Sequence, residues 1–344
     1  MPEPLRIGIL GASRIAREGV VDPAGALGHR LVGVAARSRD RAEAFAAEHG
    51  VERVHASYAD LLADPDIELV YNGLVNSAHA EWNLAALAAG KHVLSEKPLA
   101  TTGAEARAVR DAAARAGRLL AEGFHYLHHP VNVRLGELVR AGSLGRIHEV
   151  EVVLTTPAPP DADPRWSADL AGGATMDLGC YVLSALRHTG EWLGSAPVLE
   201  QVTRQVRGED GIGVVDSGVS LLARYPDVGA AGPVRVTARW DMDAAERVMT
   251  WTVHGSEASA TSPGFAVPHL DDRLVTTGPD GGWEETLGDR TSYTYQLAAV
   301  EASVREGAPF LVDGDDAVAN ADLIDATLAA AGRGRPPPGP IPTP

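Results

Sequence analysis

The sequence predicts two domains, a doubly wound α/β domain followed by an α+β domain with a large, mostly antiparallel open sheet. The first third alternates short apolar runs with alanine-rich helical stretches, a rhythm typical of a parallel sheet with right-handed crossovers. The second part contains segments of period two, which indicate half-buried antiparallel strands. The length of 344 residues fits two domains of roughly 100–200 residues each.

The first predicted domain, residues 1–123, is built from apolar runs and helical patterns in turn. The runs are continuously apolar, so we expect helices on both faces of their sheet. Gly90 and Gly117 follow two helical patterns and mark the helix ends. The predicted strands are 6–10, 31–36, 69–71, 92–94 and 119–121, and the predicted helices begin at Arg14 and cover 39–49, 78–89 and 103–116.

The second predicted domain, residues 124–331, combines one large sheet with helices on one face. Its strands are predicted at 150–154, 202–206, 218–224, 234–240 and 248–254, and its helices at 181–193, 295–305 and 315–331. The tail 332–344 is rich in proline and is expected to be disordered.

Composition excludes several classes of protein. The formal net charge of −16 would repel nucleic acid and anionic membranes. No run reaches the ~18 apolar residues that a membrane helix needs. The first residues, Met1 to Pro4, do not resemble a secretory signal, and the single cysteine, Cys180, cannot form an internal disulfide. These features predict a cytoplasmic protein that binds neither nucleic acid nor membrane.

A candidate dinucleotide turn follows the first strand, at Gly11-Ala12-Ser13-Arg14-Ile15-Ala16. In such turns the first glycine makes a tight bend and the third small residue allows close helix packing. Ser13 replaces the second glycine, so its hydroxyl is expected near the pyrophosphate. An ordinary strand-to-helix turn has a similar pattern, but the strand before and the helix after favour cofactor binding by Gly11, Ser13, Arg14 and Ile15.

The end of the second strand indicates which dinucleotide is bound. An NAD-binding domain expects a carboxylate there, whereas this chain has Arg37 and Ser38. A guanidinium and a hydroxyl suit a 2′-phosphate. The alternative, a solvated helix start, is less favourable because arginine opposes the helix dipole. The sequence therefore predicts NADP.

Two further segments carry candidate catalytic residues. Lys97 follows the strand at 92–94, where ligands bind in parallel sheets, and is a candidate general acid or base; the alternative is a surface ion pair with Glu96. Asp177 and Tyr181 are four residues apart and share one helix face. Together with Lys97 they would form a proton relay, although the pair taken alone is better explained as an N-capping aspartate and a core tyrosine. Cys180 is interpreted as core.

These segments together resemble the Gfo/Idh/MocA family, the group of glucose-fructose oxidoreductase and inositol dehydrogenase. The resemblance includes the branches of dihydrodiol dehydrogenase, xylose dehydrogenase and nucleotide-sugar 3-ketoreductase, which carry a tyrosine at the position of Tyr181. The matching segments are 8–16, 76–79, 90–93, 96–99, 129–130, 173–179 and 314–317.

The resemblance implies an N-terminal Rossmann domain and a C-terminal domain that binds substrate and pairs subunits, as a homodimer or homotetramer. It implies that Lys97 is the catalytic lysine and that Asp177 positions the lysine and the substrate. The cofactor contacts that it implies, in addition to those above, are Tyr58, Leu74, Asn76, His79, Glu96, Lys97 and Arg165. The chain departs from the family pattern at Asn72-Gly73, Val75 and Leu127, and Leu127 bears on the substrate.

The sequence therefore predicts an NADP-dependent oxidoreductase that acts on a hydroxyl or carbonyl carbon of a sugar, polyol or activated sugar. The alternatives are a reductase or dehydrogenase of trans-diols, dicarbonyls or imines, and a non-catalytic NADP-sensing protein. No metal is predicted, because the histidines His125, His128 and His129 lack a neighbouring carboxylate or cysteine and are interpreted as pocket or packing residues. Trp166, Trp240 and Trp251 are candidates for stacking on a sugar ring or for core positions.

Overall fold

The computed structural model describes residues 3–207, 214–229, 232–279 and 281–332, and its contacts divide these residues into two units. The first unit consists of 3–125 and 293–321, and the second of 126–292 and 322–332. Apart from Gly332, the predicted disordered tail lies outside the described residues.

The first unit contains a six-stranded, entirely parallel sheet in the order β3-β2-β1-β4-β5-β6. This order confirms the predicted doubly wound domain, and its direction reverses between β1 and β4, where such sheets bind ligands. The strands are β1 (Arg6–Leu10), β2 (Arg30–Ala35), β3 (Arg53–Val54), β4 (Leu69–Asn72), β5 (His92–Ser95) and β6 (Leu120–Glu122).

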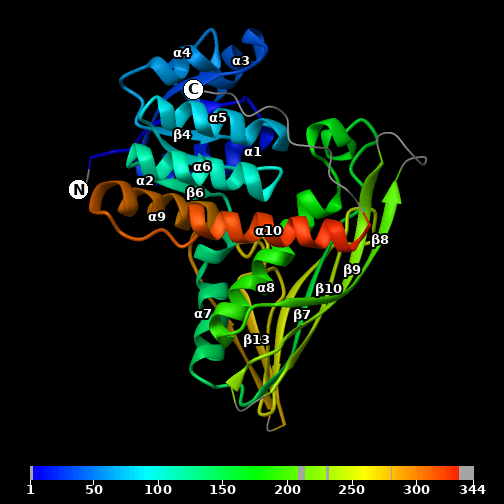
Figure 1. The fold of residues 1–344 in the computed structure, drawn as a ribbon. Helices are drawn as coiled ribbons and strands as arrows, with labels where there is room; N and C mark the ends of the chain where they lie inside the picture. The colour runs from blue at the N-terminus through cyan, green and yellow to red at the C-terminus, as the bar shows by residue number, and fades with distance from the viewer. Residues whose placement is uncertain (1–2, 208–213, 230–231, 280, 333–344) are drawn as a thin grey trace. The chain divides into compact units, whose positions relative to one another are not determined.

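Helices connect these strands and cover the sheet (Figure 1). The first crossover is one continuous helical stretch that includes a π-helical turn. The short helix α4, before β4, was not predicted. The helices are α1 (Arg14–Ala16), η1 (Arg17–Val21), α2 (Asp22–Leu27), α3 (Arg39–His49), α4 (Tyr58–Ala63), α5 (Asn76–Ala88), α6 (Gly103–Ala116) and η2 (His125–His128). Thr102 caps α6, and Gly117 ends it in the left-handed conformation, as predicted.

The first unit differs from the predicted first domain at its C-terminal end. The chain returns to it in α9 (Ser292–Glu306) and the first half of α10 (Gly314–Ala330), which the sequence had assigned to the second domain. The reason is hydrophobic: Ala317 and Ala321 belong to the same buried cluster as Val93 and Leu120 of the parallel sheet.

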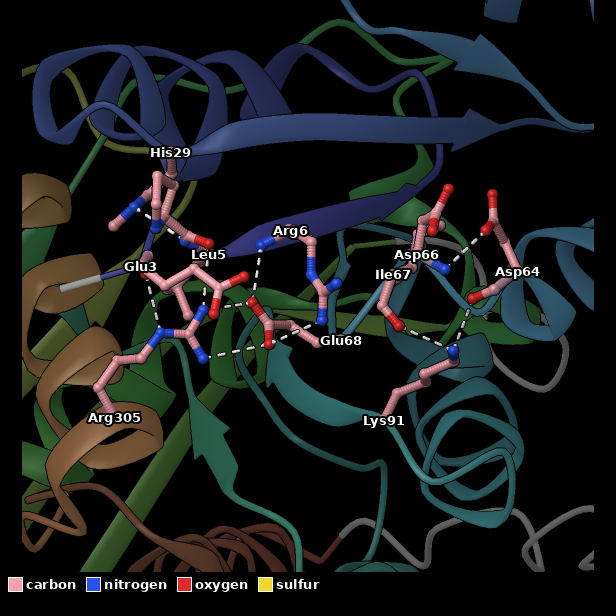
Figure 2. A network of polar contacts seen from close by, with 11 residues as sticks. Glu3, Leu5, Arg6, His29, Asp64, Asp66, Ile67, Glu68, Lys91 and Arg305 are labelled. Carbon is pink, nitrogen blue, oxygen red and sulfur yellow. Dashed lines mark hydrogen bonds and ion pairs between the residues drawn. The ribbon is translucent and has the colours of Figure 1, made fainter.

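An ion-pair network holds α9 at the start of β1 and β4 (Figure 2). The Arg305 guanidinium donates to Glu68 and to the carbonyl oxygens of Glu3 and Pro4. Glu68 also accepts from the Arg6 main-chain N–H at 3.0 Å. Burial alone would raise the pKa of Glu68, but the hydrogen bonds from Arg305 and Arg6 outweigh burial and hold its pKa below the ordinary value.

The second unit contains an eight-stranded sheet in the order β14-β13-β12-β11-β7-β10-β9-β8, in which β7 and β10 form the one parallel pair among the described residues. The predicted large, mostly antiparallel sheet is thus confirmed. Three strands, β12 to β14, were not predicted. The strands are β7 (Ile147–Thr155), β8 (Val198–Arg207), β9 (Val215–Tyr225), β10 (Val234–Asp241), β11 (Val248–Gly255), β12 (Ser259–Ser262), β13 (Arg273–Gly278) and β14 (Gly281–Thr286).

Helices α7 and α8 cover one face of this sheet (Figure 1). Helix α7 (Pro130–Arg140) was not predicted; Pro130 occupies its first turn and His129 caps it. The other helical segments are η3 (Pro164–Trp166), η4 (Ala168–Leu170), η5 (Thr175–Gly179) and α8 (Cys180–Leu193). In the described part of the chain, no helix combines the length and hydropathy that crossing a bilayer requires.

We expect Glu68→Gln to lower the free energy of unfolding by ~1–3 kcal/mol at pH 7, because it breaks a partly buried, charge-assisted contact with Arg305. The pKa of Glu68 is depressed in the folded state, so its contribution is present above the ordinary value of 4.5 and is lost as the pH falls through the folded value. Urea unfolding of the wild type and of Glu68→Gln, at pH 7 and at acidic pH, measures the difference between their free energies of unfolding. This difference should be smaller in acid.

The control is Glu52→Gln, which breaks the more exposed pair with Arg30 and should change stability by less than ~1 kcal/mol. Equal stabilities of wild type and Glu68→Gln at pH 7 would contradict the role given to this network.

Candidate active site

The segment that carries Lys97 is held by buried side chains through its main chain. It follows β5 directly, and the Lys97-Pro98 peptide bond is cis. Glu122 accepts a hydrogen bond from the Leu99 N–H at 2.6 Å, and His79 Nδ1 lies 2.8 Å from the Pro98 carbonyl oxygen. Because the carbonyl and amide groups of 98–99 are engaged by side chains of other elements, Lys97 is presented on a fixed piece of backbone.

A chain of buried amides lies beneath this segment. Asn72 at the end of β4 donates to Asn83 Oδ1 at 2.8 Å, and Asn83 donates to Ser95 Oγ at 2.9 Å and to the Leu99 carbonyl at 3.4 Å. Asn72 and Asn83 are fully buried. The unusual Asn72 is therefore one part of a satisfied polar network that connects β4, α5 and the lysine segment.

Glu96 is buried beside Lys97 and is hydrogen-bonded. The Tyr71 hydroxyl donates to Glu96 Oε1 at 2.8 Å. Burial raises the pKa of Glu96, opposed by the Tyr71 hydrogen bond and by the charge of Lys97. A Cβ at Gly19 would lie 2.4 Å from the Tyr71 hydroxyl, so this pair also explains a glycine inside the first helical stretch. The resemblance predicts that Glu96 contacts the cofactor. In the structure its carboxyl group is hydrogen-bonded to Tyr71 within the first unit.

The turn after β1 has the features of a dinucleotide cradle. Gly11 has a φ of +95°. A Cβ added to it would lie 3.0 Å from Leu74 Cδ2, so glycine is required on both counts. The hydroxyl of Ser13 is buried without a hydrogen-bond partner in the described structure, and no side chain caps the first helical turn. An orphaned hydroxyl and uncapped N–H groups are what a pyrophosphate would satisfy, so the residues present fit a dinucleotide.

The remaining predicted residues of this turn flank it. Arg14 is exposed and Ile15 is half-buried at the start of α1. Gly73, on the opposite side, has no room for a side chain, since a Cβ there would lie 2.7 Å from the Tyr71 ring and 3.1 Å from the Ser13 hydroxyl. This crowding accounts for the glycine in the Asn72-Gly73 departure from the family pattern.

Basic and hydroxyl groups gather at the end of β2. Arg37 and Ser38 are exposed, and Ser38 caps α3 by accepting from the Arg41 N–H at 3.4 Å. Arg41 donates from Nη2 to the Ala12 carbonyl of the glycine turn at 2.9 Å. Tyr58 contacts the Arg37 main chain. Burial raises the pKa of its phenol, although the charges of Arg37 and Arg41 act in the opposite direction. Sequence reasoning missed Arg41, which lies in the first turn of α3, because no local pattern signals its contact with Ala12.

Leu74, Asn76 and His79 occupy the turn after β4 and the start of α5. Leu74 and Asn76 are half-buried, and Leu74 contacts the glycine turn. His79 is buried, and its two ring nitrogens face the carbonyl oxygens of Pro98 and Leu74. In this structure the imidazole therefore acts inside the unit, between the two loops that border the cradle, rather than as an open cofactor contact.

In the second unit, Asp177 and Tyr181 lie on consecutive turns of one helix. Asp177 is in the π-helical turn η5 and Tyr181 is in α8, and the two segments are continuous. Asp216 on β9 accepts from the Thr175 N–H at 2.6 Å, and the Trp240 indole donates to the Thr175 hydroxyl at 3.1 Å. These contacts anchor the start of the helix to the sheet. Isolated π-helical turns are frequent at functional sites.

Arg165 contacts Asp177 directly. Its Nε lies 3.0 Å from Asp177 Oδ2 and its Nη1 lies 3.4 Å from Asp163. The Arg165 carbonyl accepts from the Gly173 N–H at 2.8 Å, which folds the 163–173 loop back toward the helix. The resemblance predicts a cofactor contact for Arg165; in the structure its guanidinium pairs with the predicted catalytic carboxylate.

The predicted site residues thus form two groups. Lys97 and the predicted cofactor residues, apart from Arg165, belong to the first unit, and Asp177, Tyr181 and Arg165 belong to the second. Some residues of each group have buried partners: Tyr126, for example, donates to the Ser184 hydroxyl at 3.0 Å and its ring lies 5.5 Å from that of Tyr181.

The chain contains a signal for Lys97 that motif reasoning did not use. Among 30 basic residues only two are lysines, Lys91 and Lys97. Lys91 has a structural place, donating to the carbonyl oxygens of Asp64 and Ile67 at 2.7 and 2.8 Å (Figure 2). Arginine serves nearly everywhere else, so a lysine at position 97 agrees with the prediction of a general acid or base there, since a guanidinium does not release its proton.

Most of the weaker candidates are buried and have packing roles. Cys180 is buried. Trp240 and Trp251 are fully buried, and the indole of Trp251 donates to Thr189. Trp166 instead lies on the 163–173 loop with Arg207 stacked 4.3 Å from its ring centroid. Burial lowers the pKa of His128 to about 4, assisted by His188, so this imidazole is neutral.

Comparison with known proteins places the chain in one class. An oxidoreductase family with an NAD-binding Rossmann fold matches residues 5–124, and the Gfo/Idh/MocA C-terminal domain matches residues 133–261. Both matched domains define a dinucleotide-binding oxidoreductase of two-domain architecture. The chain belongs to the Gfo/Idh/MocA oxidoreductase family.

Individual relatives cover almost the whole chain. The chain is 34% identical over 332 residues to D-xylose 1-dehydrogenase (NADP(+)) 2 of Haloferax volcanii, covering 96% of this chain and 98% of that enzyme. It is 33% identical over 338 residues to dTDP-3,4-didehydro-2,6-dideoxy-alpha-D-glucose 3-reductase of Streptomyces violaceoruber, covering 95% of each. A 3-ketoreductase from Actinomadura kijaniata, solved in complex with NADP and TDP-benzene, superimposes with a TM-score of 0.84 at 28% identity, covering 95% of this chain and 98% of that chain.

Proposed function

We propose that this protein is an NADP-dependent oxidoreductase that transfers hydride between nicotinamide and a hydroxyl or carbonyl carbon of a sugar, polyol or activated sugar. The observation that carries the proposal is the engaged backbone of Lys97-Pro98-Leu99, which presents one of only two lysines at the ligand-binding edge of a parallel sheet. The named activities of relatives, on xylose and on a nucleotide sugar, support the substrate class.

In this proposal the protein's own residues move the proton. The bound nicotinamide supplies or accepts the hydride. Lys97 and Tyr181 form the relay that gives a proton to the carbonyl oxygen in reduction and takes it from the hydroxyl in oxidation. Asp177 orients the substrate hydroxyl and the ammonium group, and the Arg165 guanidinium lies 3.0 Å from that carboxylate.

The preference for NADP rests on the end of β2. Arg37, Ser38 and Arg41 would hold a 2′-phosphate, since all three follow β2 closely and the Arg41 guanidinium contacts the glycine turn. No carboxylate occupies positions 36–38, where one would repel the phosphate.

We also propose that two copies of the chain associate through the sheet face opposite α7 and α8. This face holds a shallow hollow whose lining includes Leu222 and Thr203, and Leu222 is 43% exposed. It also carries an ion pair within one chain, in which Arg235 lies 2.7 Å from Glu149. An apolar side chain exposed on an open sheet face suits an isologous contact between two copies.

We expect Lys97→Met to lower turnover by about 10²–10⁴-fold while leaving NADPH affinity nearly unchanged, because the amine acts on the substrate proton. NADP-coupled absorbance with a panel of aldoses, inositols, keto-sugars and trans-diols measures turnover, and NADPH fluorescence measures binding. Turnover only on diols would move the substrate to the alternative class, and unchanged turnover in the variant would remove Lys97 from the relay.

The matched control is Lys91→Met. It removes the donor to two buried carbonyls and should lower the free energy of unfolding by ~2–4 kcal/mol without a comparable loss of turnover.

We expect Arg37→Asp to shift the preference from NADP toward NAD by about tenfold or more, because a carboxylate replaces a phosphate-binding cation. The ratio of kcat/KM for the two cofactors measures the shift. Arg39→Asp makes the same charge change at an exposed residue paired with Glu43 and should leave the ratio within about twofold. Identical ratios for the two variants would contradict the 2′-phosphate site.

We expect light scattering during gel filtration to give at least twice the mass of one chain, and Leu222→Asp to weaken the assembly because it places a charge in the apposed faces. Leu270→Asp is the control, since Leu270 is 69% exposed in the connection between β12 and β13. A monomeric wild type, or equal effects of both variants, would rule out this face as the interface.

A further inference from the structure

The imidazole of His79 lies between two main-chain carbonyl groups. Its Nδ1 is 2.8 Å from the carbonyl oxygen of Pro98, next to Lys97, and its Nε2 is 3.0 Å from the carbonyl oxygen of Leu74, whose side chain contacts the glycine turn. The residue is 1% exposed, so its two ring nitrogens are shielded from water.

This arrangement offers two acceptors to a ring that has one proton to donate. A neutral imidazole carries a single N–H, and only the imidazolium donates from both nitrogens. Burial and the neighbouring charge of Lys97 lower the pKa of His79, outweighing the two carbonyl contacts, which favour the cation. The ring is therefore neutral near pH 7, and its one N–H serves either the Pro98 carbonyl or the Leu74 carbonyl at a given moment.

The surroundings keep the ring in this place. The carbonyl of His79 accepts from Asn72 at 3.2 Å, and Asn72 also donates to Asn83 one helical turn further along α5. Asn83 in turn contacts the carbonyl of Leu99. Helix α5 thus presents two polar side chains, His79 and Asn83, to consecutive carbonyl groups of the lysine segment.

We propose that His79 is a positioning residue that couples the turn at Leu74, on the cofactor side, to the backbone of Lys97 through one N–H that the two carbonyl groups share. The coupling rests on the proposed roles of Lys97 and of the glycine turn. In this proposal His79 does not contact the reacting atoms. Its ring fixes the position of the Lys97 backbone and the distance between the Leu74 turn and the glycine turn.

Two substitutions separate the two contacts. The amide nitrogen of His79→Asn reaches about as far as Nδ1 and can donate to Pro98, whereas that of His79→Gln reaches about as far as Nε2 and can donate to Leu74. We expect His79→Gln to change the pKa of Lys97 by about 0.5 unit or more and to keep the NADPH dissociation constant within about twofold. We expect His79→Asn to keep the pKa of Lys97 and to weaken NADPH binding by about three- to tenfold, the factor for one lost hydrogen bond.

The chain allows the pKa of Lys97 to be read directly, because it contains only two lysines. Reductive methylation with 13C-formaldehyde labels the exposed amines, Lys97→Met assigns the Lys97 resonance, and its shift is followed against pH in the full-length protein. NADPH fluorescence gives the dissociation constant. His92→Asn, on a half-buried histidine at the opposite end of β5, is the control and should change neither quantity.

Opposite effects of the Asn and Gln variants on the two quantities support the coupling. Effects of the same kind in both variants, or none in either, overturn it, and circular dichroism melting shows whether both variants are folded. Neither measurement requires turnover, so a Lys97→Met enzyme with unchanged activity would refute the proposed relay without deciding the role of His79. If NADPH does not bind the wild type, the proposed cofactor fails and the pKa of Lys97 alone decides the role of His79.

Discussion

The main constraint on the first unit is that the backbone of Lys97-Pro98-Leu99 is buried and its polar groups must be satisfied. The contacts come from side chains on two separate elements, with His79 and Asn83 on α5 and Glu122 at the end of β6. A buried carbonyl or N–H without a partner is costly, so these residues and the segment constrain one another. The backbone of Lys97, at the start of this segment, is therefore held in one position.

One edge of the parallel sheet, where its strands end, brings the predicted cofactor-binding residues together. Parallel strands end at one edge, so the glycine turn after β1, the arginines after β2 and the lysine segment after β5 share it without being close in sequence. The ion pair of Arg305 with Glu68 and the contacts of Lys91 lie where β1 and β4 start, at the opposite edge (Figure 2). Stabilising charges and the predicted chemistry are thus kept at opposite ends of the strands, and changes at one end need not disturb the other.

Much of the site could be predicted from local patterns. The glycine turn, the lysine after β5 and the Asp177–Tyr181 helix are each short segments whose residue types report their own backbone conformation. Arg41, the Arg165–Asp177 pair and the buried roles of Glu96 and His79 could not be predicted this way, because each depends on a partner brought close by folding. The two-lysine count was visible in the sequence and became informative once Lys91 had a structural explanation.

The sequence by itself determined the fold class and most strands and helices of the parallel sheet, and it supplied the candidate residues for the chemistry, because apolar periodicity and turn residues act over short distances. Tertiary structure decided where α9 and α10 pack, why Asn72 and Gly73 are tolerated after β4, and which carbonyl groups His79 faces. These outcomes depend on burial, which removes water as an alternative partner, and burial is a property of the assembled fold that no local segment contains.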